Sequence, residues 1–153
     1  MKPRLNPYQA APEAMKAMGA LEAYVRNCGL EHSLIELVKT RASQINGCAF
    51  CIHMHTTEAR KHGESEMRLH MLNAWRESSL YSGRERAALA WTEALTLVAT
   101  TGAPDADYAL IQDAFTPGEQ VNLTLAIGAI NLWNRLQVGF RAVHPVNTAR
   151  DAA

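Results

Sequence analysis

Two cysteines three residues apart, Cys48 and Cys51, stand directly after the turn pair Asn46-Gly47, and His55 follows the second cysteine by four residues. Because an Asn-Gly pair is a strong turn signal, we expect Cys48 to lie at or just before the start of a helix. The unpaired N–H groups and the dipole at a helix N-terminus favour a thiolate over a thiol. A thiolate is the nucleophile in disulfide exchange and in attack on a peroxide oxygen. The spacing therefore indicates redox chemistry, since two such cysteines can close a small disulfide ring.

Helical periodicity predicts that the three side chains share one stripe. At about 100° per residue, with Cys48 set at 0°, Cys51 falls near roughly 300° and His55 near roughly 340°. His53 falls near roughly 140°, so we exclude it from the site. Cys51 and His55 form an i,i+4 pair, which places the imidazole where it can take the thiol proton or stabilise the thiolate.

Four other residues near this segment need an interpretation. Cys28 is expected to be a small buried hydrophobic residue, as a lone cysteine usually is. Phe50 and Met54 point away from the stripe and are expected to pack. Glu36 lies opposite the apolar side of its predicted helix and leaves two interpretations open. It is either a solvated carboxylate paired with Lys39, or a partly buried carboxylate that meets the histidine, orients it and receives its proton.

A C-x-x-C pair also permits chemistry other than redox. Zinc is one alternative, with Cys48, Cys51, His55 and a carboxylate as ligands, although no second C-x-x-C or H-x₃-H pair is present. Inert packing of both sulfurs is another. A thioredoxin is excluded, because the predicted surroundings contain no strands.

The elements that position these residues are all predicted to be helical. Alanine is abundant, valine and isoleucine are sparse, and no segment alternates polar and apolar residues over the length of a strand. We expect an all-α bundle of about six to seven helices, preceded by an extended arm that contains Pro3 and Pro7. The expected helices cover residues 12 to the stop at Gly29, 31–44, 48–62, 65–76, 84–99, 104–114 and 117–140, with a loop at 78–81.

Two helix starts are marked by capping boxes, Ser82-Gly83-Arg84-Glu85 and Thr116-Pro117-Gly118-Glu119. The helix over 117–140 is apolar almost all round, and Gly128 in its middle permits close backbone approach. A helix without a wide polar face is buried, so we expect a second copy of the chain to cover part of it, giving a homo-oligomer. The alternative is a central helix within a monomeric bundle.

Composition narrows the class of protein further. The 153 residues suit a single domain, 1–153. The 15 Lys and Arg balance the 15 Asp and Glu, which argues against nucleic-acid binding. No apolar run approaches the ~18 residues of a membrane span, so no membrane contact is expected. The first residues form no apolar signal segment, and three cysteines do not form a disulfide framework, so we expect a cytoplasmic protein.

Residues 36–55 resemble the core of the AhpD-like alkylhydroperoxidases, which belong to the carboxymuconolactone decarboxylase superfamily. The family pattern is a glutamate, the two-cysteine motif and a histidine four residues after the second cysteine. Glu36, Cys48, Cys51 and His55 fill all four positions. The likeness extends through 56–63 and the 75–91 region and covers about residues 15–142. It favours the buried, proton-accepting interpretation of Glu36.

The resemblance implies an all-helical, oligomeric peroxidase (dimer, trimer or hexamer) that needs no cofactor and no metal. Cys51 would attack the hydroperoxide, His55 and Glu36 would relay its proton, and Cys48 would resolve the sulfenic acid to a Cys48–Cys51 disulfide. A thiol or lipoyl-type reductant would restore the dithiol. Phe50 stands where the founding peroxidase has a further histidine. The alternatives are a carboxymuconolactone decarboxylase-like lyase and a non-enzymatic zinc or redox-sensing protein.

Overall fold

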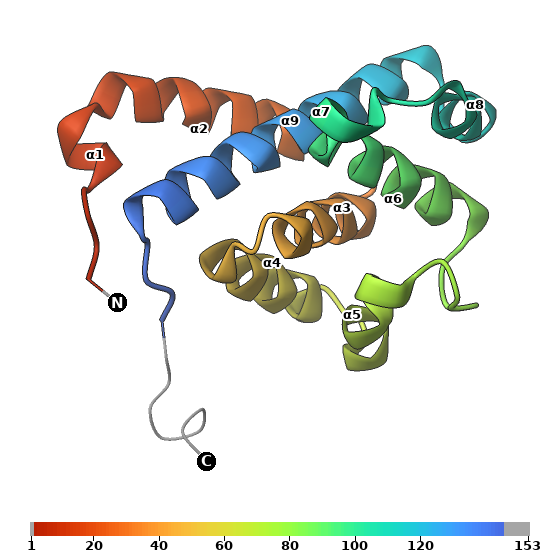
Figure 1. Cartoon of the computed structure of the whole chain (residues 1–153), viewed down its shortest axis with the longest axis horizontal. Coiled ribbons are helices and arrows are strands. Elements are labelled where there is room, and N and C mark those ends of the chain that lie inside the picture. The colour runs from red at the N-terminus through yellow and green to blue at the C-terminus, as the bar shows by residue number, and fades with distance from the viewer. Residues whose placement is uncertain (1, 146–153) are drawn as a thin grey trace.

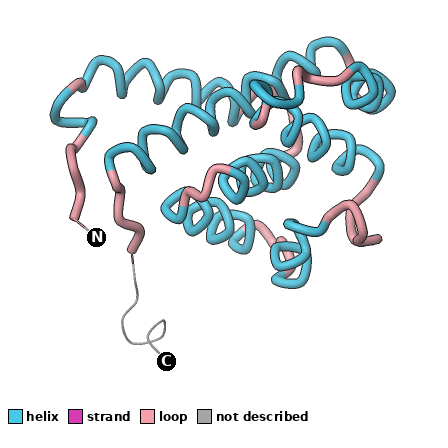
Figure 2. The backbone as a smooth tube through the Cα atoms, in the orientation of Figure 1, coloured by secondary structure: helices cyan, strands magenta, loops and turns pink. Residues whose placement is uncertain are grey.

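The computed structural model describes residues 2–145, and every regular element in that range is a helix (Figures 1 and 2). The all-α prediction is therefore confirmed. The elements, in chain order, are α1 (Pro7–Ala10), α2 (Pro12–Arg26), α3 (His32–Ile45), α4 (Ala49–Lys61), α5 (Glu66–Met71), the 3₁₀ helix η1 (Leu72–Ala74), α6 (Gly83–Thr96), α7 (Val98–Thr101), α8 (Asp105–Ala114) and α9 (Pro117–Phe140).

The predicted count of six to seven helices is wrong, because the described residues form nine α-helices. The two unexpected ones, α1 and α7, have four residues each, too few to show a periodicity. α1 interrupts the arm that was expected to be extended: the Asn6 side chain accepts a hydrogen bond from the Tyr8 N–H, and Pro7 occupies the first helical position. The seven longer α-helices follow the predicted segments, except that the fourth continues beyond Met71 as η1.

Both predicted capping boxes are present. Ser82 begins α6, and its hydroxyl accepts from the Glu85 N–H while the Glu85 carboxylate accepts from the Ser82 N–H. Thr116 and Glu119 make the same reciprocal pair at the start of α9. Each box satisfies two backbone donors that the helix itself leaves unpaired, so these starts depend on local sequence alone.

The centre of the bundle is α3, which packs against α4, α6 and α9 (Figure 1). Its apolar side enters the main core, which includes Val25, Leu34, Val38, Ile111, Leu123 and Ile127. A separate cluster between α3, α4 and α9 contains Ala42, Cys48, Cys51 and Ile130. The two cysteines are thus part of a packed core. None of the helices in residues 2–145 is long and apolar enough to cross a membrane.

Helix α9 is buried on one side and open on the other. Its exposed side carries Val121, Leu125, Leu132 and Val138, so the helix is not enclosed by the described residues 2–145. The close backbone approach that Gly128 permits is not made by the described residues of this chain, since none of their atoms outside α9 lies within 4 Å of the position of a Cβ there.

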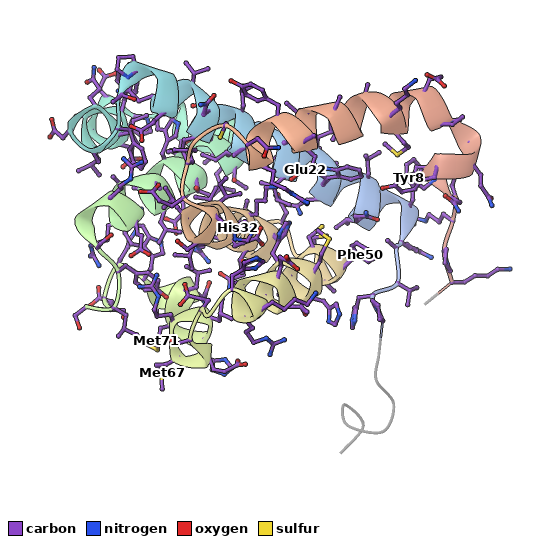
Figure 3. The ribbon with its side chains drawn as sticks, turned by 180° about the vertical axis from the view of Figure 1, so that it is seen from behind. Tyr8, Glu22, His32, Phe50, Met67 and Met71 are labelled. Atoms are coloured by element: carbon purple, nitrogen blue, oxygen red, sulfur yellow. The ribbon has the colours of Figure 1, made fainter. Side chains whose placement is uncertain are left out.

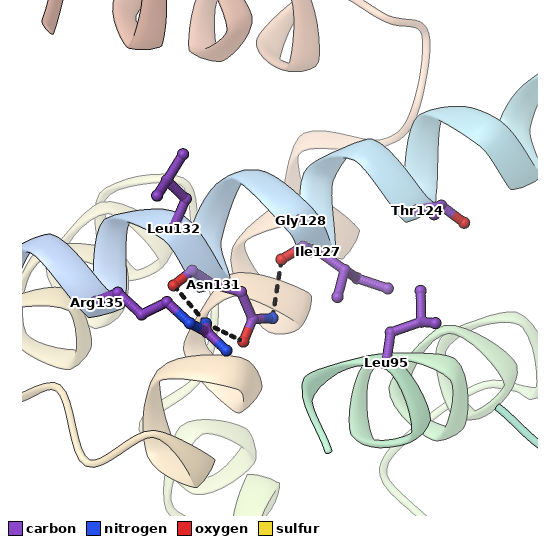
Figure 4. Close-up of a pocket in the computed structure, with 7 residues that line it drawn as sticks. All are labelled: Leu95, Thr124, Ile127, Gly128, Asn131, Leu132 and Arg135. Carbon is purple, nitrogen blue, oxygen red and sulfur yellow. Dashed lines mark hydrogen bonds between the residues drawn. The ribbon is translucent and has the colours of Figure 1, made fainter. Parts of the chain in front are cut away.

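A shallow pocket of about 310 Å³ runs past Gly128 instead (Figure 4). Leu95, Leu132 and Arg135 contribute to its wall. Asn131 donates to the Ile127 carbonyl at 2.9 Å and so turns its polar end away from solvent. Arg135 is the only ionisable side chain in the lining, so this pocket holds no cluster that could carry acid–base or redox chemistry.

Candidate active site

The cysteine pair lies where the turn after α3 leads into α4. Gly47 has a φ of 64°, a left-handed conformation that glycine adopts without strain. Cys48 is the N-cap of α4, and its sulfur accepts a hydrogen bond from the Cys51 N–H at 3.3 Å. Both cysteines are only 1% exposed and both are free thiols. The helix start predicted from Asn46-Gly47 is therefore confirmed, and the sulfur of Cys48 receives a donor that the helix leaves unpaired.

Glu36 on α3 meets His55 on α4. The Glu36 Oε2 atom lies 2.8 Å from His55 Nδ1, and each residue is 6% exposed. Lys39 pairs with Glu22 of α2, so the interpretation of Glu36 as a solvated partner of Lys39 is wrong. Because Nδ1 is engaged by the carboxylate, Nε2 is the ring nitrogen of His55 that remains for another group.

The two thiols influence each other's acidity. The hydrogen bond with the Cys51 thiol lowers the pKa of Cys48 to about 7, against the opposing effect of burial. The same hydrogen bond, together with burial and the charge on Cys48, raises the pKa of Cys51. Interacting groups titrate as a pair, so the dithiol loses one proton near pH 7 and holds the second far more tightly. One thiolate is therefore available at neutral pH.

An amide of α9, Asn134, is a part of the site that sequence reasoning missed. It is 1% exposed, and its amide lowers the pKa of both cysteine thiols. Its Nδ2 donates to Ser43 Oγ at 3.0 Å, and its Oδ1 accepts from Asn46 Nδ2 at 2.9 Å. These contacts fix the turn before α4 against α9. Nothing in the sequence sets Asn134 apart from the other two asparagines of α9, Asn122 and Asn131.

A cavity of about 700 Å³ opens onto this group. Cys51, His55 and Glu36 reach its wall, whereas Cys48 does not. The wall has contributions from α1, α2, α3 and α4, as the labelled Tyr8, Glu22, His32 and Phe50 show (Figure 3). Its apolar members are Pro3, Leu5, Pro7, Tyr8, Ile35, Phe50, Met54, Trp133 and Ala142.

Phe50 and Met54 were expected to pack. Phe50 does so, against the cluster that contains the two cysteines, whereas Met54 is exposed. Both also line the cavity, which the helical projection did not predict. The exclusion of His53 agrees with the structure: its ring stacks on His144 at 5.1 Å and does not line the cavity. Cys28 is half-buried and packs against the main core.

The zinc interpretation of the cysteines is not supported by the geometry. Within residues 2–145, the group whose side chains come close enough to hold a metal ion is His32, Glu58 and His62, and it includes neither cysteine.

The structure is that of a small, all-helical two-cysteine protein. Its cysteine pair is buried at the start of α4, and a histidine–glutamate pair links that helix to α3. The chain belongs to the carboxymuconolactone decarboxylase family, whose model matches residues 12–94. It is an AhpD-like member of that group: the fold, the four-residue pattern and the similar structures agree on this point.

Two similar proteins share nearly the whole chain. The uncharacterized protein YdfG of Bacillus subtilis (strain 168) is 43% identical over 138 residues, which cover 90% of this chain and 94% of that protein. The crystal structure of ATU0492 from Agrobacterium tumefaciens, a protein of unknown function described as a candidate antioxidant defence protein AhpD, superposes with a TM-score of 0.93 at 52% identity. That match covers 95% of this chain and 100% of ATU0492.

A more distant structure shares the fold. The debrominase Bmp8 has a TM-score of 0.82 at 16% identity, with 90% of this chain and 74% of that protein covered. The fold therefore carries more than one activity, and function has to be argued from the site.

Proposed function

We propose that this protein is a thiol peroxidase that reduces hydroperoxides through a Cys48/Cys51 dithiol–disulfide cycle, with His55 and Glu36 as its proton relay. The observation that carries the proposal is the arrangement of the four groups. One sulfur faces a cavity, the second is buried directly behind it, and a buried imidazole–carboxylate pair stands beside them.

The first step is attack by the Cys51 thiolate on the outer oxygen of a hydroperoxide, ROOH. The S–O bond forms, the O–O bond breaks, and the leaving alkoxide takes a proton to become ROH. In the second step the Cys48 sulfur attacks the sulfenic acid of Cys51, which forms the disulfide and releases water. The two thiols lose two electrons in total, and the peroxide gains them.

Cavity access supports Cys51 as the attacking residue, because Cys48 does not reach the cavity wall. The charge of the resting pair lies on Cys48, whose pKa is about 7. Movement of one proton across the contact between the sulfurs transfers that charge to Cys51. His55, held through Nδ1 by Glu36, has Nε2 free to receive a thiol proton and return it to the leaving alkoxide.

The cavity indicates the kind of substrate. Ile35, Phe50 and Trp133 give it an apolar and aromatic wall, which suits a hydroperoxide with an alkyl or aryl body better than hydrogen peroxide. Re-reduction of the disulfide takes two thiol groups, supplied by one dithiol or by two monothiols in turn through a mixed disulfide. The reductant is therefore proposed to be a thiol or lipoyl-type group that reaches Cys51 through the cavity. We also propose a homo-oligomer, because the apolar side of α9 is open in the single chain.

The test compares Cys51→Ser with Cys48→Ser in pre-reduced protein treated with cumene hydroperoxide. Cys51→Ser should consume no peroxide. Cys48→Ser should consume one equivalent and accumulate a sulfenic acid that dimedone traps at Cys51. Full peroxide consumption by Cys51→Ser would refute the proposal. So would decarboxylation of a lactone acid that survives replacement of both cysteines by alanine, because that result would identify a lyase.

A further inference from the structure

A second cluster of ionisable side chains lies beside the dithiol site, and two of its members, His32 and Glu58, line the same cavity as Cys51. His32 is the first residue of α3 (Figure 3), and Glu58 and His62 stand four residues apart at the end of α4. One ligand atom from each of the three lies within 4.8 Å of the other two. The cluster is partly open to solvent, with His32 and Glu58 about two-fifths exposed.

One atom of this cluster has no partner among the described residues. Nδ1 of His32 is buried and makes no hydrogen bond within residues 2–145. A buried nitrogen without a partner is costly unless a ligand or water meets it. Nε2 of the same ring lies 3.8 Å from Glu36 Oε1, so the ring directs its other nitrogen towards a carboxylate. In a metal-bound imidazole one nitrogen binds the ion and the other faces an acceptor. Glu36 stands in the place of that acceptor, at an ion-pair distance rather than a hydrogen-bond distance.

The other two members are suited to the same task. His62 Nδ1 lies 3.0 Å from the Glu58 carbonyl oxygen, which favours the proton on Nδ1 and leaves a lone pair on Nε2. The two histidine rings lie side by side, with centroids 4.2 Å apart. Glu58 supplies a carboxylate whose present partners are the exposed Lys61 at 3.4 Å and Nδ1 of His62 at 3.6 Å. An exposed pair of this kind contributes little, so a cation can displace it.

We propose that His32, Glu58 and His62 bind a divalent transition-metal ion of the Zn²⁺ class. Two imidazoles and one carboxylate form a donor set that such ions favour, and three protein ligands leave a coordination position open to solvent. Glu36 would hold the His32 ring in place, as carboxylates do around metal-bound histidines, and it would then contact both His32 and His55. The metal site stands independently of the peroxidase proposal, since it uses neither cysteine.

The test titrates Co²⁺ into chelator-treated protein that carries Cys28→Ser, Cys48→Ser and Cys51→Ser, so that no thiol contributes. Binding of one ion per chain should be seen in the visible Co²⁺ spectrum, and Zn²⁺ should displace it. His32→Gln and His62→Gln should each weaken binding at least about tenfold, since even loss of an outer partner costs about 10–100-fold. His53→Gln is the matched control, on the same helix and stacked on another histidine, and should leave binding unchanged.

Absence of saturable binding, or affinity that neither His32→Gln nor His62→Gln changes, would overturn the proposal. If circular dichroism shows that the triple cysteine variant is unfolded, the same titration is made with the reduced natural chain. There, a thiolate-to-cobalt charge-transfer band together with unchanged affinity in both histidine variants would assign the ion to the cysteines and overturn the proposal. Weakened binding without that band would support it.

Discussion

Replacement of Glu36 by glutamine tests the proton relay while leaving the packing almost unchanged. Glutamine has the same shape, and its carbonyl can still accept the hydrogen bond from His55 Nδ1 that the carboxylate accepts at 2.8 Å. What is lost is the negative charge. The imidazolium that forms when His55 takes a thiol proton then has no counter-charge at this position, so the variant separates electrostatic stabilisation from orientation.

The size of the effect follows from the burial of the pair. Both residues are 6% exposed, so solvent screens the interaction weakly. A hydrogen bond to a charged group contributes about 1.5–3 kcal/mol. At about 1.4 kcal/mol per factor of ten in rate, the variant should lose about 10- to 100-fold in the rate of the first thiol oxidation. Folding should be affected much less, because glutamine leaves no unpaired charge in the core.

The assay is a single-turnover measurement of thiol loss after reduced protein is mixed with cumene hydroperoxide. Glu66→Gln is the control, since it removes a carboxylate from an exposed ion pair with Arg60, and neither residue lines the cavity. Its rate should equal that of the natural chain. An unchanged rate in Glu36→Gln, with the melting temperature also unchanged, would refute the role assigned to the carboxylate.

Three further outcomes are expected. The rate of thiol oxidation should rise with pH through about 7 and then level off. The reason is that the pair first loses a proton at Cys48, whose pKa is about 7, and this creates the nucleophile. A rate that still climbs above about pH 8.5 would indicate an ordinary thiol. Leu132→Glu, on the open side of α9, should reduce the mass of the assembly measured by light scattering. Leu110→Glu changes a similarly exposed leucine on α8 and should leave that mass unchanged. An unchanged mass in Leu132→Glu would exclude this surface as the interface. Thr116→Ala should lower the free energy of unfolding by about 1 kcal/mol through loss of the α9 cap. A calorimetric scan should show a fall of about 2–4 °C in melting temperature. Thr100 is exposed and caps no helix, so Thr100→Ala should show no such fall.

The longer helices and both capping boxes could be predicted because their signals are local. A hydroxyl and a carboxylate three residues apart are sufficient to begin α6 at Ser82 and α9 at Thr116. The four-residue helices α1 and α7 are too short for periodicity to reveal them. The position of Cys48 at the start of α4 also depended on a local signal, the Asn-Gly turn.

The completed site depends on contacts that no local pattern contains. Periodicity placed Glu36 on a polar side of its helix, and only the packing of α3 against α4 turns that side inward onto His55. Periodicity left two interpretations of Glu36 open, and the resemblance to the AhpD-like proteins favoured the buried one. The cavity joins Tyr8 and Trp133, which are distant in sequence, and Asn134 reaches the sulfurs from α9. Such long-range contacts are set by tertiary packing.

The direct test of the central claim is peptide mass spectrometry of reduced protein after one equivalent of cumene hydroperoxide. The proposed cycle predicts loss of two free thiols per chain, recovery of a Cys48–Cys51 disulfide and release of one equivalent of the alcohol, with Cys28 still reduced. Recovery of Cys48 and Cys51 as free thiols, with the peroxide intact, would contradict it.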